Sequence, residues 1–189
     1  MDNKGSNVTH TSPTALVIST NYGTETEELV GTVSRLTDAG ISVTVSAPEQ
    51  APIRTLVLDA QPGPEVTPDT ELAAESAASY DALVIPGGTL NADALRVNSD
   101  AQRIAREFAE SGKVIAAICH GPWLLAETAL SSGRTLTSYS SIRTDLTNAG
   151  ARWVDSEVVV DTADDYTVIT SRTPDDIPAF AGAIVTALS

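Results

Sequence analysis

Short apolar runs alternate with amphipathic segments along most of the chain. Residues 14–20 are apolar and rich in β-branched side chains, and residues 41–46 alternate apolar with polar, so both predict strands. The polar residues 21–24 predict a turn, and residues 25–38 predict a helix that Thr24 caps. Apolar side chains recur in that helix at helical spacing, at Leu29, Val30, Val33 and Leu36. A strand, a helix and a strand of these lengths predict a βαβ unit and therefore a parallel sheet.

The same alternation continues to the end of the chain. Further strands are predicted at 81–88, 114–118 and 136–138, and a hairpin at 157–161 with 166–170. Further helices are predicted at 71–79, 100–111, 123–130, 141–148 and from Pro174 onward. Three of the ten prolines fall between residues 61 and 68, so residues 48–68 predict an irregular excursion with a short strand or hairpin. The expected fold is one doubly wound, flavodoxin-like α/β domain over residues 14–189, with a mostly parallel sheet.

The composition is that of one globular domain. The chain has 189 residues, of which 42% are hydrophobic, and no apolar run reaches the roughly 18 residues of a membrane span. Residues 1–13 are polar and lack the basic start and apolar middle of a signal peptide, so they predict a disordered lead-in. A cytoplasmic location is therefore expected. The single cysteine cannot form an internal disulfide, which agrees with a reducing compartment.

The charge of the chain narrows the choice of partners. Lys and Arg number 11 against 25 Asp and Glu, which gives a formal net charge of −14. Such a surface repels phosphates, so a nucleic-acid partner is excluded. Two histidines and one cysteine are too few for a typical zinc site, so no metal site is expected.

The only cysteine, Cys119, lies where an apolar run gives way to a helix. Residues 114–118 predict a buried strand, His120, Gly121 and Pro122 follow the cysteine, and a helix is predicted from Trp123. An abrupt turn from strand to helix exposes the residue at the turn in a strained conformation, near a helix N-terminus that favours a thiolate. Free cysteines are commonly inert core residues, which is the competing interpretation. The position at the junction favours a nucleophile.

Four sequence blocks resemble one known family. Ala117-Ile-Cys-His-Gly-Pro122 resembles the nucleophile elbow of the DJ/PfpI (ThiJ/PfpI) superfamily, which is related to the class I glutamine amidotransferases. Residues 80–88 resemble the strand and glycine pair that precede this elbow in the family. Residues 137–155 and 171–180 resemble later blocks of the branch of PfpI-type intracellular peptidases and general stress proteins. Together the resemblance extends over residues 14–188.

The resemblance implies an acid after the first strand, within hydrogen-bond reach of the cysteine. Glu25 matches that position best. The segment before it, Tyr22-Gly-Thr-Glu25, is one residue longer than the usual family motif, so Glu27 and Glu28 are alternatives. A protonated carboxyl at this position would donate a hydrogen bond to the cysteine or act as a general acid and base. The competing interpretation is that all three glutamates form a favourable acidic first helical turn.

The resemblance also implies roles for several further residues. His120 would be the general base, and the family orients this histidine with an acid from a second subunit, at the position of Asp93. Asp93 is otherwise explained as a helix cap. Backbone N–H groups of Gly88 and His120 would form the oxyanion hole. Candidate pocket-lining residues are Gly87, Trp123 and Tyr139. Core packing or a dimer contact would explain Trp123 equally well, and placement on an amphipathic helix would explain Tyr139. The acid supplied in trans predicts a homodimer or a larger homo-oligomer.

The function implied by the resemblance is that of a cysteine-dependent stress-protection enzyme. Its substrates would be small reactive carbonyl compounds, in a glyoxalase III-like or deglycase-like reaction, or peptides. The chemistry requires neither a metal nor an organic cofactor, and no membrane partner is expected. The alternative is a non-enzymatic redox-sensing or chaperone-like stress protein that uses oxidation of Cys119.

Overall fold

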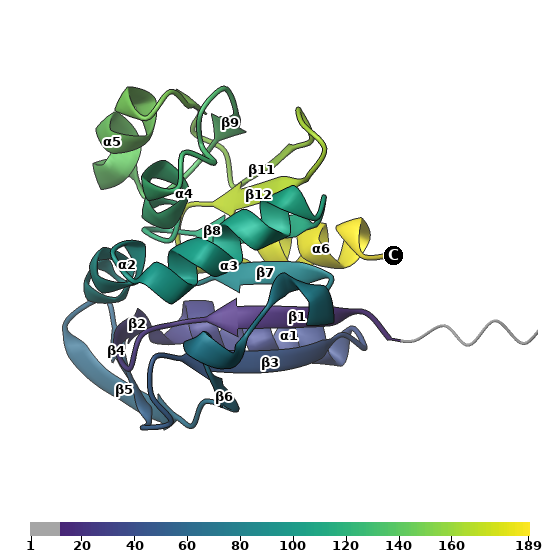
Figure 1. Ribbon diagram of the computed structural model, residues 1–189. Helices are drawn as coiled ribbons and strands as arrows, with labels where there is room; N and C mark the ends of the chain where they lie inside the picture. The colour runs from purple at the N-terminus through teal and green to yellow at the C-terminus, as the bar shows by residue number, and fades with distance from the viewer. Residues whose placement is uncertain (1–11) are drawn as a thin grey trace, which may run out of the picture.

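A seven-stranded sheet runs through the centre of the computed structural model, which describes residues 12–189 (Figure 1). The predicted lead-in lies outside the described residues, apart from residues 12 and 13. The strand order is β11-β12-β8-β7-β1-β3-β6, and every neighbouring pair is parallel except β11 with β12. The strands are β1 (Thr14–Ile18), β3 (Ser42–Ala47), β6 (Thr70–Glu71), β7 (Ala82–Ile85), β8 (Val114–Ile118), β11 (Val158–Asp161) and β12 (Val168–Ser171). The prediction of a mostly parallel α/β fold is confirmed.

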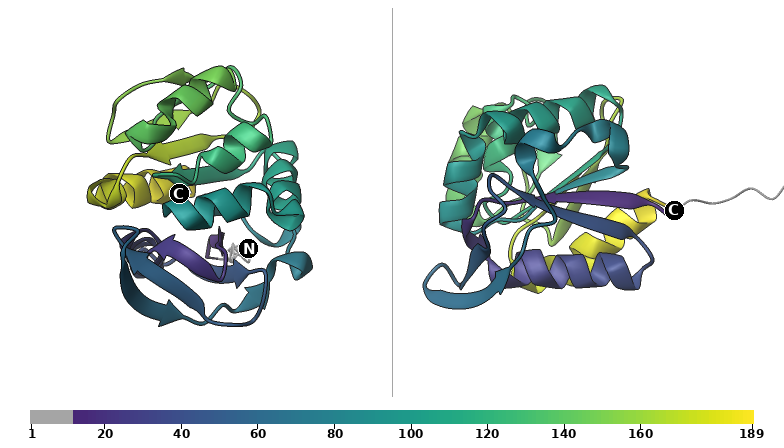
Figure 2. Two further views of the ribbon diagram at one scale, coloured as in Figure 1. Left: turned by 90° about the vertical axis from the view of Figure 1, so that its left-hand side faces the viewer. Right: turned by 60° about the horizontal axis from the view of Figure 1, so that its bottom comes forward.

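Helices cover both faces of this sheet (Figures 1 and 2). One face packs against α3 (Ser99–Glu110) and α4 (Trp123–Glu127), and the other against α1 (Thr32–Asp38) and α6 (Ile177–Ala187). Side chains of a strand alternate between the two faces, so Leu16 and Ile18 of β1 join the first core, whereas Ala15 and Val17 join the second. Strands buried on both faces must be apolar throughout, which explains the continuous runs in the sequence.

A small second sheet forms beside the carboxyl end of β1. It consists of β2 (Tyr22–Glu25), β4 (Ile53–Val57) and β5 (Gln61–Val66), with β2 parallel to β4 and β4 antiparallel to β5. The hairpin predicted within residues 48–68 is confirmed by β4 and β5. The turn predicted at residues 21–24 is wrong, because β4 offers these residues a strand to pair with. The helix consequently begins later than predicted, with a single π-helical turn, η1 (Glu27–Gly31), that leads into α1.

Other elements differ from the predictions in detail. The helix predicted at residues 71–79 is two 3₁₀ turns, η2 (Leu72–Ala74) and η3 (Ala77–Ser79). They are separate because Glu75 and Ser76 are extended and the Ser76 hydroxyl accepts a hydrogen bond from the Ala78 N–H, which competes with a continuous helix. Helix α2 (Thr89–Arg96), which the sequence pattern did not predict, follows the glycine pair. The remaining elements are β9 (Thr135–Leu136), β10 (Arg152–Trp153), α5 (Arg143–Asn148), η4 (Ser140–Ile142) and η5 (Pro174–Asp176).

Strands β1, β7 and β8 end at one edge of the sheet, and Asn91 of α2 joins the first two. Its side-chain oxygen accepts hydrogen bonds from the Thr20 N–H at 2.7 Å and from the Thr20 hydroxyl at 2.9 Å, directly after β1. Its side-chain N–H₂ group donates to the carbonyls of Pro86, at 3.2 Å, and Gly87, at 2.9 Å, directly after β7. Because Asn91 is fully buried, no water replaces these bonds, and the amide fixes the loops that lead into the edge. Among residues 12–189, no helix is long and apolar enough to cross a membrane.

The substitution Asn91→Ala tests whether these hydrogen bonds hold the ends of β1 and β7 together. It leaves a buried backbone N–H and two carbonyls without their partner, so we expect the free energy of unfolding to fall by about 2–4 kcal/mol. Urea unfolding followed by circular dichroism measures the change. Asn148→Ala, which removes an exposed amide at the end of α5, is the matched control and should change stability by no more than about 0.5 kcal/mol. Equal losses in the two variants would contradict the role of Asn91.

Candidate active site

Cys119 follows β8 directly and has a left-handed backbone, with φ of 62°. This conformation is uncommon outside glycine and costs free energy, so its surroundings must stabilise it. Both backbone groups of Cys119 are bonded: its N–H donates to the Ser171 carbonyl at 3.0 Å, and its carbonyl accepts from the Tyr139 N–H at 2.9 Å. The chain then turns tightly, with the Gly121 N–H bonded to the Ile118 carbonyl at 2.8 Å, and enters α4. The geometry is that of a strand-to-helix elbow.

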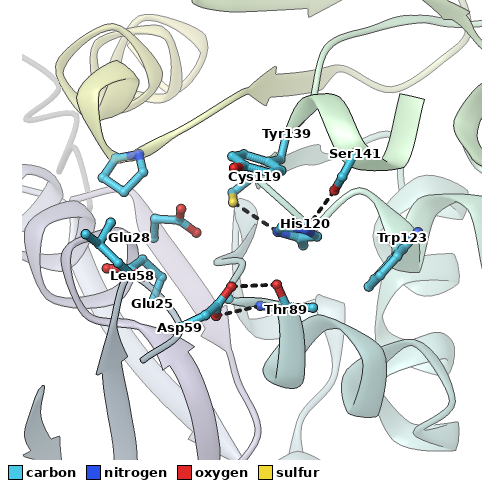
Figure 3. Close-up of a pocket in the computed structure, with 12 residues that line it drawn as sticks. Glu25, Glu28, Leu58, Asp59, Thr89, Cys119, His120, Trp123, Tyr139 and Ser141 are labelled. Atoms are coloured by element: carbon cyan, nitrogen blue, oxygen red, sulfur yellow. Dashed lines mark hydrogen bonds between the residues drawn. The ribbon is translucent and has the colours of Figure 1, made fainter. Parts of the chain in front are cut away.

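The Cys119 side chain faces a cavity of about 560 Å³ at the edge of the sheet (Figure 3). Segments far apart in the sequence form its walls: the end of β2, η1, the turn between β4 and β5, the start of α2, the elbow, and residues 139–141. The thiol-bearing residue is only 7% exposed, so a ligand reaches it through this cavity and not across an open surface. Cavities of this size and position hold small molecules or short peptide segments.

The carboxyl group beside Cys119 belongs to Glu28. Glu28 is fully buried on η1, its Oε2 accepts a hydrogen bond from the Gly87 N–H at 2.7 Å, and its carboxyl interacts with the Cys119 thiol. Glu25, which the sequence favoured for this position, also lines the cavity, but its carboxyl interacts with the backbone N–H groups of Leu58 and Asp59 in the β4–β5 turn. The placement of Glu25 at the cysteine is therefore corrected to Glu28. The reason is β2, which keeps the chain extended through Glu25 and delays the first helical turn.

The surroundings of Glu28 favour its neutral form. Burial raises the pKa of Glu28 to about 8, although the hydrogen bonds from Gly87 and Cys119 oppose that shift. A carboxyl with this pKa is mostly protonated at neutral pH. Burial also raises the pKa of Glu25, and the N–H groups of Leu58 and Asp59 oppose that shift.

The protonation state of Glu28 also affects the pKa of the Cys119 thiol. Burial, followed by the negative charge of an ionised Glu28 and its hydrogen bond, raises the pKa of Cys119. The backbone N–H groups of Gly88 and His120 lower the pKa of the thiol because they stabilise negative charge on sulfur. A protonated Glu28 removes the repulsive charge and offers the sulfur a donor. A neutral Glu28 is thus compatible with a thiolate, and an ionised one is not.

His120 is bonded at both ring nitrogens. Its Nδ1 lies 3.2 Å from Cys119 Sγ, and its Nε2 lies 3.1 Å from Ser141 Oγ (Figure 3). The ring stacks on Tyr139, with centroids 4.9 Å apart and planes inclined by 28°, and meets Trp123 at 5.4 Å and 58°. Burial lowers the pKa of His120, and the charge of Asp59 opposes that shift. A neutral imidazole with a free lone pair is suited to accept a proton from the thiol.

Two glycines allow the loop after β7 to approach the elbow closely. A Cβ on Gly87 would lie 2.8 Å from the Cβ of Cys119 and 2.7 Å from Glu28 Oε2. Gly88 has a φ of 82°, and a Cβ there would lie 2.3 Å from the Gly23 carbonyl oxygen. No other residue type fits at either position without displacing its neighbours. The backbone N–H groups of Gly88 and His120 both act on the Cys119 sulfur, and the oxyanion hole that they would form remains a prediction.

The other predicted residues fall into two groups. Trp123 and Tyr139 line the cavity, whereas Gly87 lies behind it, against Glu28 and the elbow. Asp93 is exposed on α2 and does not line the cavity of its own chain, and as an internal residue of α2 it is not the cap of that helix. Its role in trans remains a prediction. Among residues 12–189, no group of three His, Cys, Asp or Glu side chains is arranged to hold a metal ion.

Several lining residues had no signal in the sequence. Asp59 lies in the turn of the β4–β5 hairpin, and its carboxylate accepts hydrogen bonds from the N–H and hydroxyl of Thr89 at the start of α2. Neither residue belongs to a recognisable motif, because the hairpin returns to the site only in three dimensions. Ser141 lies within a block that carried the family resemblance, and its two-residue distance from Tyr139 was the available hint.

Comparison with known proteins agrees with this geometry. The model of the DJ-1/PfpI family matches residues 13–187. General stress protein 18 of Bacillus subtilis is 40% identical over 159 residues, which are 84% of this chain and 88% of the relative. Deglycase PfpI of Pyrococcus furiosus is 36% identical over 156 residues, 82% of this chain and 88% of the relative. The crystal structure of DJ-1beta from Drosophila melanogaster superposes with a TM-score of 0.83 at 34% identity, covering 94% of this chain and 91% of that one.

The raised pKa of Glu28 predicts a specific dependence of stability on pH. The folded state holds the proton of Glu28 up to about pH 8, whereas the unfolded chain releases it near the ordinary carboxyl pKa of 4.5. The contribution of this proton to the free energy of unfolding is therefore full below pH 4.5 and is lost as the pH rises through 8. Each pH unit in that window is worth about 1.4 kcal/mol per proton. We expect Glu28→Gln, which is neutral at every pH, to flatten the fall in the free energy of unfolding. Urea unfolding at several pH values between 5 and 8 measures it, and a variant with the wild-type slope would contradict the assignment.

Proposed function

This chain belongs to the DJ-1/PfpI family, and we propose that it is a cysteine-dependent enzyme whose Cys119 thiolate attacks carbonyl carbons. The observation that carries the proposal is the contact of Cys119 Sγ with His120 Nδ1, at 3.2 Å, on a strained elbow inside a cavity. A nucleophile beside a base that is itself bonded to a third group is the common arrangement of nucleophilic catalysis. A core cysteine would need none of these neighbours.

In the first step of the proposed reaction, each group around Cys119 has one role. His120 Nδ1 accepts the thiol proton, the sulfur bonds to the carbonyl carbon, and the π electrons of the carbonyl move to its oxygen. The N–H groups of Gly88 and His120 stabilise that negative oxygen. The protonated Glu28, which interacts with the Cys119 sulfur, is a second proton donor beside the adduct. With an aldehyde, the negative oxygen takes up a proton to give a hemithioacetal. With a peptide bond, the C–N bond breaks as the nitrogen takes the proton from His120, the amine leaves, and water then hydrolyses the thioester.

The walls of the cavity favour substrates without negative charge. Among residues 12–189, three carboxyl groups line it, from Glu25, Glu28 and Asp59, and no lysine or arginine does. An anionic substrate would be repelled by the ionised carboxylates, whereas a neutral or cationic one would not. This supports small reactive carbonyl compounds, such as 2-oxoaldehydes and their adducts with amines, or peptides. The deglycase and stress-protein names of the relatives are consistent with such a protective role.

Loss of the thiol tests the proposal directly. We expect Cys119→Ala to reduce turnover of the substrates by at least about 10³-fold, because the nucleophile is removed. The measurement is a panel of 2-oxoaldehydes, glycated thiols and peptides, with the melting temperature of the variant as the control for folding. A Cys119→Ala or Cys119→Ser variant that keeps full activity on a substrate that wild type turns over would refute the mechanism.

The redox-sensing alternative uses the same cysteine. The N–H groups of Gly88 and His120, together with a protonated Glu28, would also stabilise an oxidised sulfur. The substrate panel separates the two functions: a wild type that is inactive throughout but is oxidised selectively at Cys119 by mild peroxide, as shown by mass spectrometry, favours the sensor.

A second copy of the chain is the proposed source of the acid for His120. Asp93 lies on the outer face of α2 between two exposed apolar side chains, Leu90 at 49% and Val97 at 69% exposure. Residues three and seven positions apart share one face of a helix, so these three side chains form one surface. An apolar surface that carries a carboxylate suits a partner subunit, whose site the carboxylate would then complete.

Light scattering and the variant Asp93→Asn test this role. We expect wild type to be at least a dimer, and the variant to keep that state while its kcat falls about 3–10-fold, since a negative charge that would favour the imidazolium is removed. Glu110→Gln, which neutralises an exposed carboxyl at the end of α3, is the control and should keep the wild-type kcat. A strictly monomeric and fully active protein would contradict the assignment of Asp93.

A further inference from the structure

The Nε2 atom of His120 already has a hydrogen-bond partner within its own chain. Ser141 Oγ lies 3.1 Å from Nε2, while Nδ1 lies 3.2 Å from Cys119 Sγ, so the imidazole bridges the serine and the cysteine (Figure 3). We propose that Ser141 is a positioning residue, whose hydroxyl accepts a hydrogen bond from Nε2–H and thereby turns the lone pair of Nδ1 toward the thiol. The inference rests on the proposed role of Cys119 as a nucleophile.

The neutral imidazole of His120 has two possible tautomers. One ring nitrogen carries the proton and the other carries the lone pair. With the proton on Nε2 and bonded to Ser141, the lone pair on Nδ1 faces the S–H group. The proton then moves from Sγ to Nδ1, and the electron pair of the S–H bond stays on sulfur. In the opposite tautomer Nδ1 would face the thiol with a hydrogen and could accept nothing.

The hydroxyl of Ser141 matters more after the proton has moved. The imidazolium donates from both nitrogens, to the thiolate through Nδ1–H and to Ser141 through Nε2–H. A hydrogen bond from a charged donor is about twice as strong as a neutral one. Ser141 therefore stabilises the thiolate–imidazolium pair more than the neutral pair. Loss of the hydroxyl should make the thiolate harder to form.

The segment that carries Ser141 is fixed to the elbow. The Tyr139 N–H donates to the carbonyl of Cys119 at 2.9 Å, and the Tyr139 ring stacks on the imidazole. Just before it, the Ser138 hydroxyl accepts a hydrogen bond from the indole N–H of Trp153 at 2.9 Å. The 3₁₀ turn η4 then presents Ser141 to Nε2. One short segment thus holds both the backbone of the nucleophile and the ring of the base.

Other groups around His120 act without a bond to Nε2. Among residues 12–189, Ser141 is the group that hydrogen-bonds Nε2. The titratable and charged groups nearby come from several elements: Cys119, Glu28, Asp59 and Tyr139 in the cavity wall, and Asp145 and Arg96, which bind Trp123. The charge of Asp59 favours the imidazolium through space but fixes no tautomer. The orientation of the ring therefore depends on Ser141.

Alkylation of the thiol by iodoacetamide, measured across pH, tests the proposal in the intact protein. Cys119 is the only cysteine of the chain, so the rate reports on this thiolate alone and needs no substrate. We expect Ser141→Ala to slow alkylation at pH 7 about tenfold and to shift the rate profile to higher pH. Ser141→Thr keeps a hydroxyl and should react within about twofold of wild type.

Ser140→Ala is the matched control, because it removes the adjacent exposed serine of the same turn, whose hydroxyl makes no hydrogen bond among the described residues. It should leave the rate and its pH profile unchanged. A Ser141→Ala variant with the wild-type rate and profile would overturn the proposal. So would equal slowing in Ser140→Ala, or a Ser141→Thr variant as slow as Ser141→Ala, because the effect would then belong to the turn and not to the hydroxyl. A wild type that alkylates rapidly but turns over no substrate would contradict the proposed enzyme function alone.

Discussion

The left-handed backbone of Cys119 is the constraint on which the site depends. A non-glycine residue with φ of 62° persists only where its neighbours hold it, and here a strand and a loop do so. Ser171 at the end of β12 accepts from its N–H, and Tyr139 donates to its carbonyl. The sheet thus fixes the elbow from one side and the loop after β9 from the other. Because the tight turn that follows brings the N–H of His120 to the sulfur, the strained conformation that turns the thiol into the cavity also supplies a donor for negative charge.

The glycine pair after β7 belongs to the same arrangement. Gly87 and Gly88 leave room for the elbow to approach within contact distance, and Asn91 ties the loop that contains them to the end of β1. The sheet alone would place three strand ends near one another without defining distances. The buried amide of Asn91 turns that proximity into a fixed geometry, so the N–H of Gly88 can point to one place. The geometry of the candidate site therefore depends on buried backbone pairing as much as on the side chains that line it.

The sequence identified the elements that are defined by their own residues. The apolar runs of β1, β7 and β8, the elbow at Cys119 and the glycine pair were all predictable, because each depends on local pattern or on a contiguous motif. The strand β2 was not, since its extended conformation comes from pairing with β4, some thirty residues away. That pairing moved the start of the helix, so the acid beside Cys119 is Glu28, one of the two alternatives, and not Glu25. Asp59 and Ser141 reach the site from loops, where periodicity carries no information.

The three carboxyl groups of the cavity, from Glu25, Glu28 and Asp59, have different surroundings and therefore different properties. Glu28 is fully buried with a single backbone donor, so its neutral form is favoured and it can offer a proton. Burial raises the pKa of Glu25, and the N–H groups of Leu58 and Asp59 in the β4–β5 turn oppose that shift. Asp59 binds the start of α2 through Thr89 and reaches His120 only through space. If all three were ionised and unpaired, their repulsion would oppose a thiolate. The proposed thiolate is compatible with this cavity because Glu28 favours its neutral form and backbone N–H groups offset part of the negative charge of Glu25 and Asp59.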